Sequence, residues 1–163
     1  LEKVGSFHMG SKINPGTLTV VLREEVKINN QDYGNRNEIK IKGVADVSQR
    51  IVSVPIADTT TLLQLSGSVG PGTFGIDSVK YGRVTNLDNS NWVRLSFVSS
   101  SNAPEDFNRY DVRLDAGQSF IFSNAKISGS AAGSAFDSFV DFTSLKAKAN
   151  SEAVDLELFV ATS

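Results

Sequence analysis

The residues most able to do chemistry in this sequence are three pairs of neighbouring carboxylates. Glycoside hydrolases use two carboxyl groups about 5–10 Å apart across a cleft. The pairs are Glu24 with Glu25, Glu105 with Asp106, and Asp137 with Asp141. Each pair also has a simpler interpretation, because adjacent strand residues point to opposite faces, Pro104 introduces a surface loop, and the third pair flanks apolar residues. We therefore expect no glycosidase site.

Other catalytic and ligand-binding patterns are incomplete. A serine nucleophile needs a base, and the sequence has one histidine, His8, and neither a Gly-x-Ser-x-Gly elbow nor a cysteine. The segment 88–91 (Asp-Asn-Ser-Asn) resembles the start of a calcium loop but lacks its glycine and closing glutamate, so it predicts a turn. The segment 70–72 lacks the lysine of a phosphate-binding loop. The sequence therefore predicts no enzyme and no catalytic, metal-binding or cofactor-binding residues.

Trp92 is the residue that we select as a possible interface. It follows the Asp/Asn/Ser turn and is expected on the strand face opposite Val93, Leu95 and Phe97. If those three side chains pack inward, Trp92 points outward near the end of a loop. It then either packs under a neighbouring loop or contacts a second subunit or a ligand, because exposed aromatic residues are concentrated at recognition surfaces.

Short segments with alternating apolar residues position these candidates. Arg83–Phe97 predicts two strands joined by a hairpin turn at 87–91, and the same pattern recurs at Tyr110–Ser123 and Ser144–Ser163. The clearest half-buried strand is expected around Val154–Val160. These segments favour about eight to ten strands and an all-β fold: a single-domain antiparallel β-sandwich, jelly-roll-like.

The first half shows weaker forms of the same pattern. Thr17–Ile28 predicts a strand, a polar loop is expected at 29–35, and Arg36–Val44 predicts its hairpin partner. Gln49–Pro55 does not alternate cleanly, so this strand is expected to be covered on both sides or to lie at an interface. Gly67–Gly75 is the richest in turn residues and predicts a loop.

Length and charge limit the organisation and the partners. The 163 residues suffice for one core, with residues 17–163 as the sandwich domain. The 16 basic and 18 acidic residues alternate along the chain without a basic or acidic block, which predicts no nucleic-acid partner and no membrane partner. The absence of cysteine leaves the redox compartment open.

Residues 1–16 are expected to form an N-terminal arm or, in part, a leader left by cloning. Met9 followed by Gly-Ser-Lys resembles a natural start, in which case His8 lies outside the native protein. The Pro15-Gly16 pair is a possible hinge for such an arm.

Five segments carry a resemblance to a known family. They are REEVKINNQDYGN (23–35), GVADVSQRIVSVP (43–55), VKYGRVTNLDNSNWVRLSF (79–97), YDVRLDAGQSFIF (110–122) and SLKAKANSEAVDLELFVA (144–161). Together they resemble small structural virion proteins of tailed bacteriophages, marine ones in particular. The resemblance covers the chain from about Thr17 onward and rests on turn-and-strand patterns. It implies no catalytic residues.

The resemblance implies a capsid decoration (cement) protein on the outside of a phage capsid. Such a protein is expected to form a homo-oligomer, a trimer, and to bind the major capsid protein in the assembled lattice. A phage tail or fibre component is one alternative. The other is a carbohydrate-binding module with Trp92, Tyr81, Tyr110 or Tyr33 as the sugar-stacking surface.

Overall fold

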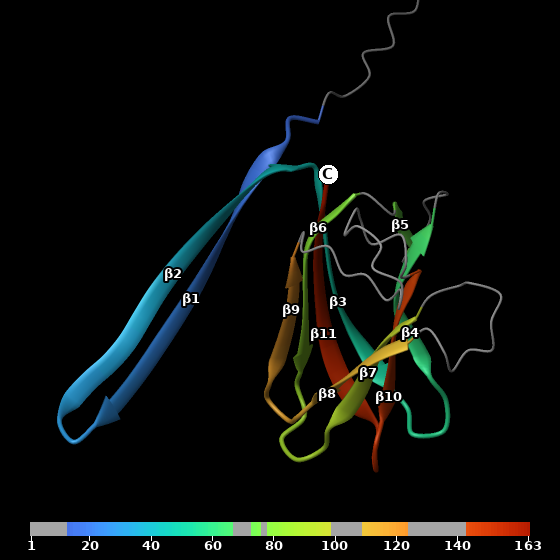
Figure 1. Ribbon diagram of the computed structural model, residues 1–163. Coiled ribbons are helices and arrows are strands. Elements are labelled where there is room, and N and C mark those ends of the chain that lie inside the picture. The colour runs from blue at the N-terminus through green and yellow to red at the C-terminus, as the bar shows by residue number, and fades with distance from the viewer. Residues whose placement is uncertain (1–12, 67–72, 76–77, 99–108, 124–142) are drawn as a thin grey trace, which may run out of the picture. The chain divides into compact units, whose positions relative to one another are not determined.

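Strands form in every segment that this computed structural model describes, namely residues 13–66, 73–75, 78–98, 109–123 and 143–163. Figure 1 shows them as arrows. They are β1 (Gly16–Ile28), β2 (Gln31–Val44), β3 (Asp46–Val54), β4 (Thr60–Ser66), β5 (Thr73–Gly75), β6 (Val79–Asn86), β7 (Val93–Val98), β8 (Arg109–Leu114), β9 (Ser119–Ser123), β10 (Ser144–Ala149) and β11 (Val154–Thr162). The described residues include no helix, and the prediction of an all-β fold is confirmed.

The chain divides into two units, Leu1–Ala45 and Asp46–Ser163. We call the first the hairpin unit, because β1 and β2 form a two-stranded sheet of their own, and the second the sandwich unit. The units meet between Ala45 and Asp46, whereas the sequence analysis placed residues 17–163 in one sandwich domain. Alternation in residues 17–44 correctly predicts strands, but it does not specify which sheet a strand joins.

The hairpin unit is closed by a two-residue turn. Antiparallel pairing runs without interruption from Thr17 opposite Lys42 to Ile28 opposite Gln31. Asn29 and Asn30 have φ values of 52° and 61°, the left-handed conformation that asparagine tolerates and that a type I′ hairpin turn requires at both positions. The predicted loop at 29–35 was too long, because residues 31–35 continue the ladder despite their polarity.

At its other end the hairpin contains a β-bulge. Gly16 pairs with Val44 and Thr17 with Lys42, so Gly43 is left without a partner across the ladder. Its φ of 74° is strained for residues with a side chain, and glycine adopts it without cost. The bulge locally disrupts the pairing just before the hairpin unit ends.

The sandwich unit contains two sheets, with strand orders β5-β4-β10-β7-β8 and β3-β11-β6-β9. Pairing is antiparallel except between β4 and the short β5. Each sheet contains strands from both the start and the end of this unit, because β11 lies between β3 and β6 and β10 lies between β4 and β7. This β-sandwich confirms the expected fold class, and its strand order is compatible with the jelly-roll-like arrangement expected from the sequence.

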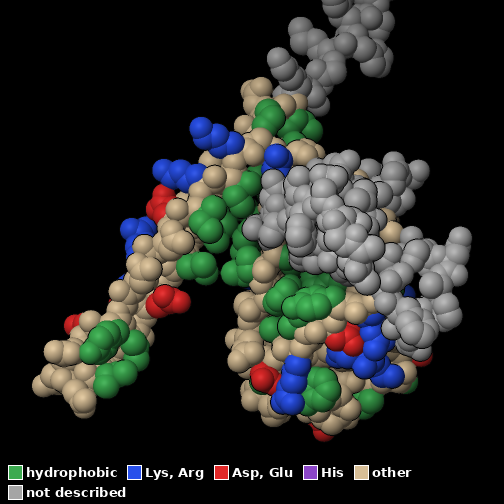
Figure 2. Space-filling view, viewed as in Figure 1, with side chains coloured by type: hydrophobic (Ala, Val, Ile, Leu, Met, Phe, Trp, Pro, Cys, Tyr) green, Lys and Arg blue, Asp and Glu red, His purple; other side chains and the backbone are tan. Residues whose placement is uncertain are grey.

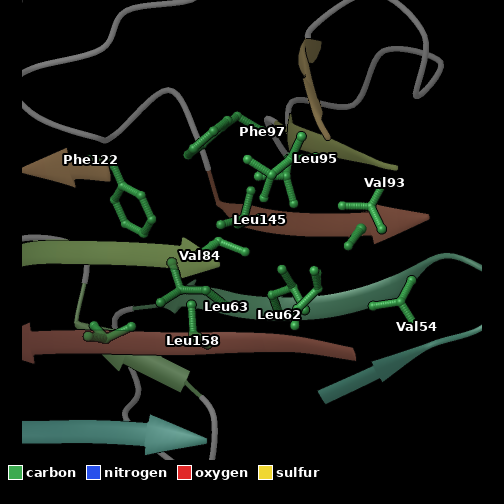
Figure 3. Close-up of a cluster of buried hydrophobic side chains, with 14 of the residues drawn as sticks. Val54, Leu62, Leu63, Val84, Val93, Leu95, Phe97, Phe122, Leu145 and Leu158 are labelled. Atoms are coloured by element: carbon green, nitrogen blue, oxygen red, sulfur yellow. The ribbon is translucent and has the colours of Figure 1, made fainter. Parts of the chain in front are cut away.

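The core lies between these sheets and is aliphatic apart from a few aromatic rings. Figure 3 shows the side chains of Val84 and Leu158 from one sheet near those of Leu62 and Leu145 from the other. All four are at most 1% exposed. Strand β11 supplies the most regular inward row, and the strand predicted around Val154–Val160 is confirmed. A buried leucine or valine contributes about 1.5–3 kcal/mol relative to an exposed one, so this core is a major source of stability for the sandwich unit.

The hairpin predicted at 87–91 was assigned the wrong connectivity, whereas all three predicted two-strand segments do contain two strands. Arg83–Phe97, Tyr110–Ser123 and Ser144–Ser163 each begin in one sheet and end in the other, as β6–β7, β8–β9 and β10–β11. The turn at 87–91 therefore connects two sheets and is no hairpin tip. Sheets packed face to face are about 10 Å apart. A short polar segment can span this distance as readily as it can join two neighbouring strands of one sheet, so the turn residues alone do not distinguish the two connections.

Two smaller predictions also differ from the structure. Strand β3 is the edge of its sheet and is not covered on both sides by the described residues, since Ile51 is 66% exposed. Its placement at an interface stays a prediction. Within the predicted loop Gly67–Gly75, residues 73–75 form β5 beside β4, while the rest lies outside the described residues.

Candidate functional site

The hairpin unit presents one apolar face. Directly opposed residues of an antiparallel pair share a face, so the register places Leu18 with Ile41, Val20 with Ile39, and Val26 with Tyr33. We call its apolar part the apolar hairpin face; the members are Leu18, Val20, Leu22, Val26, Ile28, Tyr33, Ile39 and Ile41. Four polar residues lie on the same side of the hairpin: Glu24, Gln31, Asn35 and Asn37. Near the turn Val26, Ile28 and Tyr33 are each more than half exposed. Figure 2 shows hydrophobic side chains gathered at this end of the hairpin.

The opposite face of the hairpin is charged. Ion pairs join Arg23 to Glu25, Lys27 to Asp32 at 3.6 Å, and Glu38 to both Arg36 and Lys40 at 3.5 and 3.4 Å. Exposed pairs of this kind contribute about 0–1 kcal/mol each, so they favour solubility of this face more than stability of the hairpin. The hairpin therefore has one face suited to water and one suited to a protein surface.

An isolated two-stranded hairpin is marginal in water at best and needs a further surface to pack against. Full burial of a valine, leucine or isoleucine is worth about 1.5–3 kcal/mol, so covering side chains that are half exposed contributes on the order of 1 kcal/mol each. The apolar hairpin face is consequently the strongest candidate for a recognition surface among the described residues. Alternation in residues 17–44 predicts the two strands but not that they form a sheet of their own, so this surface did not follow from the sequence.

Trp92 is half-buried and already has neighbours within the chain. The guanidinium carbon of Arg113 lies 4.8 Å from the centre of the indole ring, and the Arg113 Nε donates to Asp115 at 2.7 Å. The Trp92 carbonyl accepts from the backbone N–H of Asn150 at 3.3 Å. One side of the ring is thus occupied by Arg113, a cation–π contact. Its role as a possible interface residue stays a prediction.

The segment after β6 is organised by two side chains. Asn86 is fully buried; its amide nitrogen donates to the carbonyls of Asn91 (2.9 Å) and Leu114 (3.2 Å). The Asp88 carboxylate accepts from the backbone N–H groups of Ser90 and Asn91 at 2.8 and 2.7 Å. These bonds hold the pKa of Asp88 below its ordinary value, because they favour the ionised form. Asp88 therefore caps a turn, as its spacing predicted.

The predicted carboxylate pairs are not brought into a cleft where the structure describes them. Glu24 lies opposite Asn35 and Glu25 opposite Gly34, so the two point to opposite faces of the hairpin as expected. The pairs at 105–106 and 137/141, like His8, lie outside the described residues.

The four aromatic residues of the carbohydrate-binding alternative are not equally available. Tyr81 is 6% exposed and packs edge-on against Phe159, with ring centres 6.0 Å apart; burial raises its pKa. Tyr33 belongs to the hairpin unit, whereas Tyr110 is half exposed on the sandwich unit and lies 6.1 Å from the Phe97 ring. Tyr81 is too buried to serve as a sugar-stacking surface.

Pairing of the strands brings together cations that are far apart in the sequence. Lys148 lies opposite Arg94, and Arg94 lies opposite Arg113 on the next strand. Sequence analysis missed this row because the three residues come from three separate segments and form no basic block. The signal that could have found it is the charged alternation of Lys146 and Lys148, but only strand order shows which strands lie beside it.

Among the described residues, no three histidine, cysteine or acidic side chains are grouped as a metal site would require. No helix that could cross a membrane occurs in those segments either. A search of protein-family models found no family that matches the chain, and a search of curated proteins found no significant relative.

Proposed function

We propose that this protein is a virion structural protein, a capsid decoration (cement) protein that assembles as a homotrimer and stabilises a phage head. On this proposal it is not an enzyme, its partner is the major capsid protein, and it is located on the capsid exterior. The observation that carries the proposal is the apolar hairpin face, an exposed surface on a unit that cannot bury it alone. The resemblance of the sequence to phage virion proteins supplies the setting.

The hairpin suits an element that joins one copy to others. Its two strands of 13 and 14 residues span roughly 40 Å at about 3.3 Å per residue, far enough to reach a neighbouring subunit. In a cyclic trimer each interface joins two different surfaces and the same pair of surfaces recurs three times, so the hairpin of one copy would contact another surface of its neighbour at every interface. Val26, Ile28 and Tyr33 near the turn are the residues that we expect to be covered.

The sandwich unit suits a rigid block on a shell. A decoration protein that binds only the assembled lattice adds favourable free energy to that state and to no other. For this it needs a stable body and no moving catalytic parts, and the aliphatic core between two sheets supplies such a body. Of the carboxylate pairs singled out in the sequence, the described one, Glu24 with Glu25, points to opposite faces of the hairpin.

The test compares neighbouring residues on the two faces of β1. Val26→Asn places a polar side chain on the apolar hairpin face. Lys27→Asn places the same side chain on the charged face, one residue further along β1, and is the control. We expect the wild type and Lys27→Asn to be trimers by light scattering and to cosediment with assembled empty capsids. Val26→Asn should weaken self-association at least tenfold, because it places an amide in an apolar contact.

Two outcomes would count against the proposal. A wild-type protein that is monomeric over a wide concentration range would exclude the homotrimer. Equal binding to assembled capsids and to unassembled capsid subunits would exclude cement function, which requires preference for the lattice. Imaging of particles separates the tail alternative, because a tail component would be found as rings or spikes on the tail and not on capsid faces.

A further inference from the structure

The outer face of the five-stranded sheet carries a cluster of cations that the proposed function does not use. Arg94 lies at its centre on β7, with Lys148 opposite on β10 and Arg113 opposite on β8. Lys146 lies on the same face because Leu145 and Ala147 pack into the core, and Arg109 does so because it alternates with Arg113 along β8. Figure 2 shows Lys and Arg side chains gathered over β7, β8 and β10.

These side chains surround a hollow of about 110 Å³. Four cations line it, Arg94, Arg109, Lys146 and Lys148, and the hydroxyl side chains of Thr59 and Ser96 contribute two further donors. No acidic residue is part of the described lining. The donors come from β7, β8, β10 and the segment before β4. A hollow of this size can hold a small anion, whereas a flat macromolecular surface could not enter it.

Most of this positive charge is not neutralised within the described part of the chain. Arg109 pairs with Asp111 at 3.0 Å, and Arg113 pairs with Asp115 at 2.7 Å while lying over Trp92. No described carboxylate forms an ion pair with Arg94, Lys146 or Lys148. Like charges directly opposite each other in a sheet are destabilising, so the direct pairing of Lys148 with Arg94 costs stability unless an anion lies between them.

We infer that this hollow, the cation pocket, binds a phosphate or sulfate group. Three cations without a described partner favour a doubly charged group over a single carboxylate. A tetrahedral oxyanion can also accept from several sides at once, whereas a carboxylate offers two oxygens in one plane. The inference is independent of the proposed function, because it concerns the sandwich unit and not the hairpin.

The experiment measures thermal unfolding of the full chain with added inorganic phosphate or sulfate, against chloride at equal ionic strength. A ligand that binds only the folded state raises the midpoint with the logarithm of its concentration, by on the order of 5 °C at ten times its half-saturating concentration. Methyl phosphate should act like phosphate if the pocket accepts an ester. Acetate should have at most a tenth of the effect. Backbone amide shifts of Arg94, Ser96 and Lys148 should move with the same half-saturation.

Lys148→Gln distinguishes a binding site from a merely structural charge. Without added anion, this variant should unfold at the same or a higher temperature than the wild type, because it removes a like-charge pair. Its half-saturating phosphate concentration should rise at least tenfold. Lys40→Gln, which removes one exposed cation from the hairpin unit, is the matched control and should respond to phosphate like the wild type.

Three results would overturn the inference. They are a phosphate response no greater than that of chloride, an equal response to acetate, and loss of stability in Lys148→Gln without anion. The last would show that the cation already has a stabilising partner within the chain.

Discussion

At the residue scale, Asn86 shows how one buried polar side chain can set the path of several segments. Its side-chain oxygen accepts from the backbone N–H of Asp88 at 2.9 Å, in addition to the two bonds that its amide nitrogen donates. Its own backbone N–H donates to Gln118 at 2.9 Å, and its carbonyl accepts from Gly117 at 3.1 Å. All of its donors and acceptors are thus used, which is the condition under which a buried amide is tolerated.

Replacing Asn86 with leucine should therefore lower the stability of the sandwich unit, although leucine is apolar and the site is fully buried. The change leaves the carbonyls of Asn91 and Leu114 and the N–H of Asp88 without their partner, and we expect a loss of about 2–4 kcal/mol in the free energy of unfolding. Chemical denaturation measures it. Thr85→Ala, which removes one exposed hydrogen bond to Ser119, is the control and should cost less than about 1 kcal/mol. Equal losses would mean that Asn86 is not the organising residue.

At the element scale, the hairpin depends on close approach of its two strands near the turn. A Cβ atom built on Gly34 would lie 2.7 Å from the backbone oxygen of Glu24, closer than real Cβ contacts allow. Backbone, and not a flexible side chain, would have to move to relieve it. Glycine at this position is therefore a requirement of the strand pairing and not of the turn, which Asn29 and Asn30 form.

Gly34→Ala should loosen the hairpin and leave the sandwich unchanged, because its contact lies wholly within β1 and β2. We expect amide hydrogen exchange in these two strands to accelerate about tenfold or more, while exchange in β11 stays as in the wild type. Asn35→Ala is the control, since its backbone already carries a Cβ atom. Unchanged exchange in Gly34→Ala would show that the strands can separate slightly without loss of pairing.

At the scale of the whole molecule, the sequence predicts which side of a strand is buried but not which strands pair with one another. The inward rows of Val93–Phe97 and Val154–Val160 followed directly from alternation, because a residue's face depends only on its position along the strand. Which strands pair depends on contacts between distant segments, and alternation does not contain that information. This is why a hairpin was predicted at 87–91, where the chain crosses between sheets, and why both the apolar hairpin face and the cation pocket were missed.

The division into two units predicts that the sandwich folds without the hairpin. A chain of residues 46–163 retains both sheets of the sandwich and the whole of its core cluster. We expect it to unfold cooperatively with one transition, whereas a peptide of residues 1–45 should show no cooperative transition by circular dichroism. Failure of 46–163 to fold would show that the sandwich needs the hairpin for stability. A cooperatively folded 1–45 peptide would show that the hairpin buries its apolar face alone.

The short connection between the units determines how mechanical load would travel through the molecule. Ala45 alone separates the last residue of β2 from the first of β3, so tension on the hairpin passes directly into the backbone of β3. That strand is fastened to β11 by a nine-residue antiparallel register and to no described strand on its other side. A pull along β3 loads the hydrogen bonds between β3 and β11 together, whereas a pull across β3 breaks them one after another. The connection between the units should therefore resist force along the strand better than force across it.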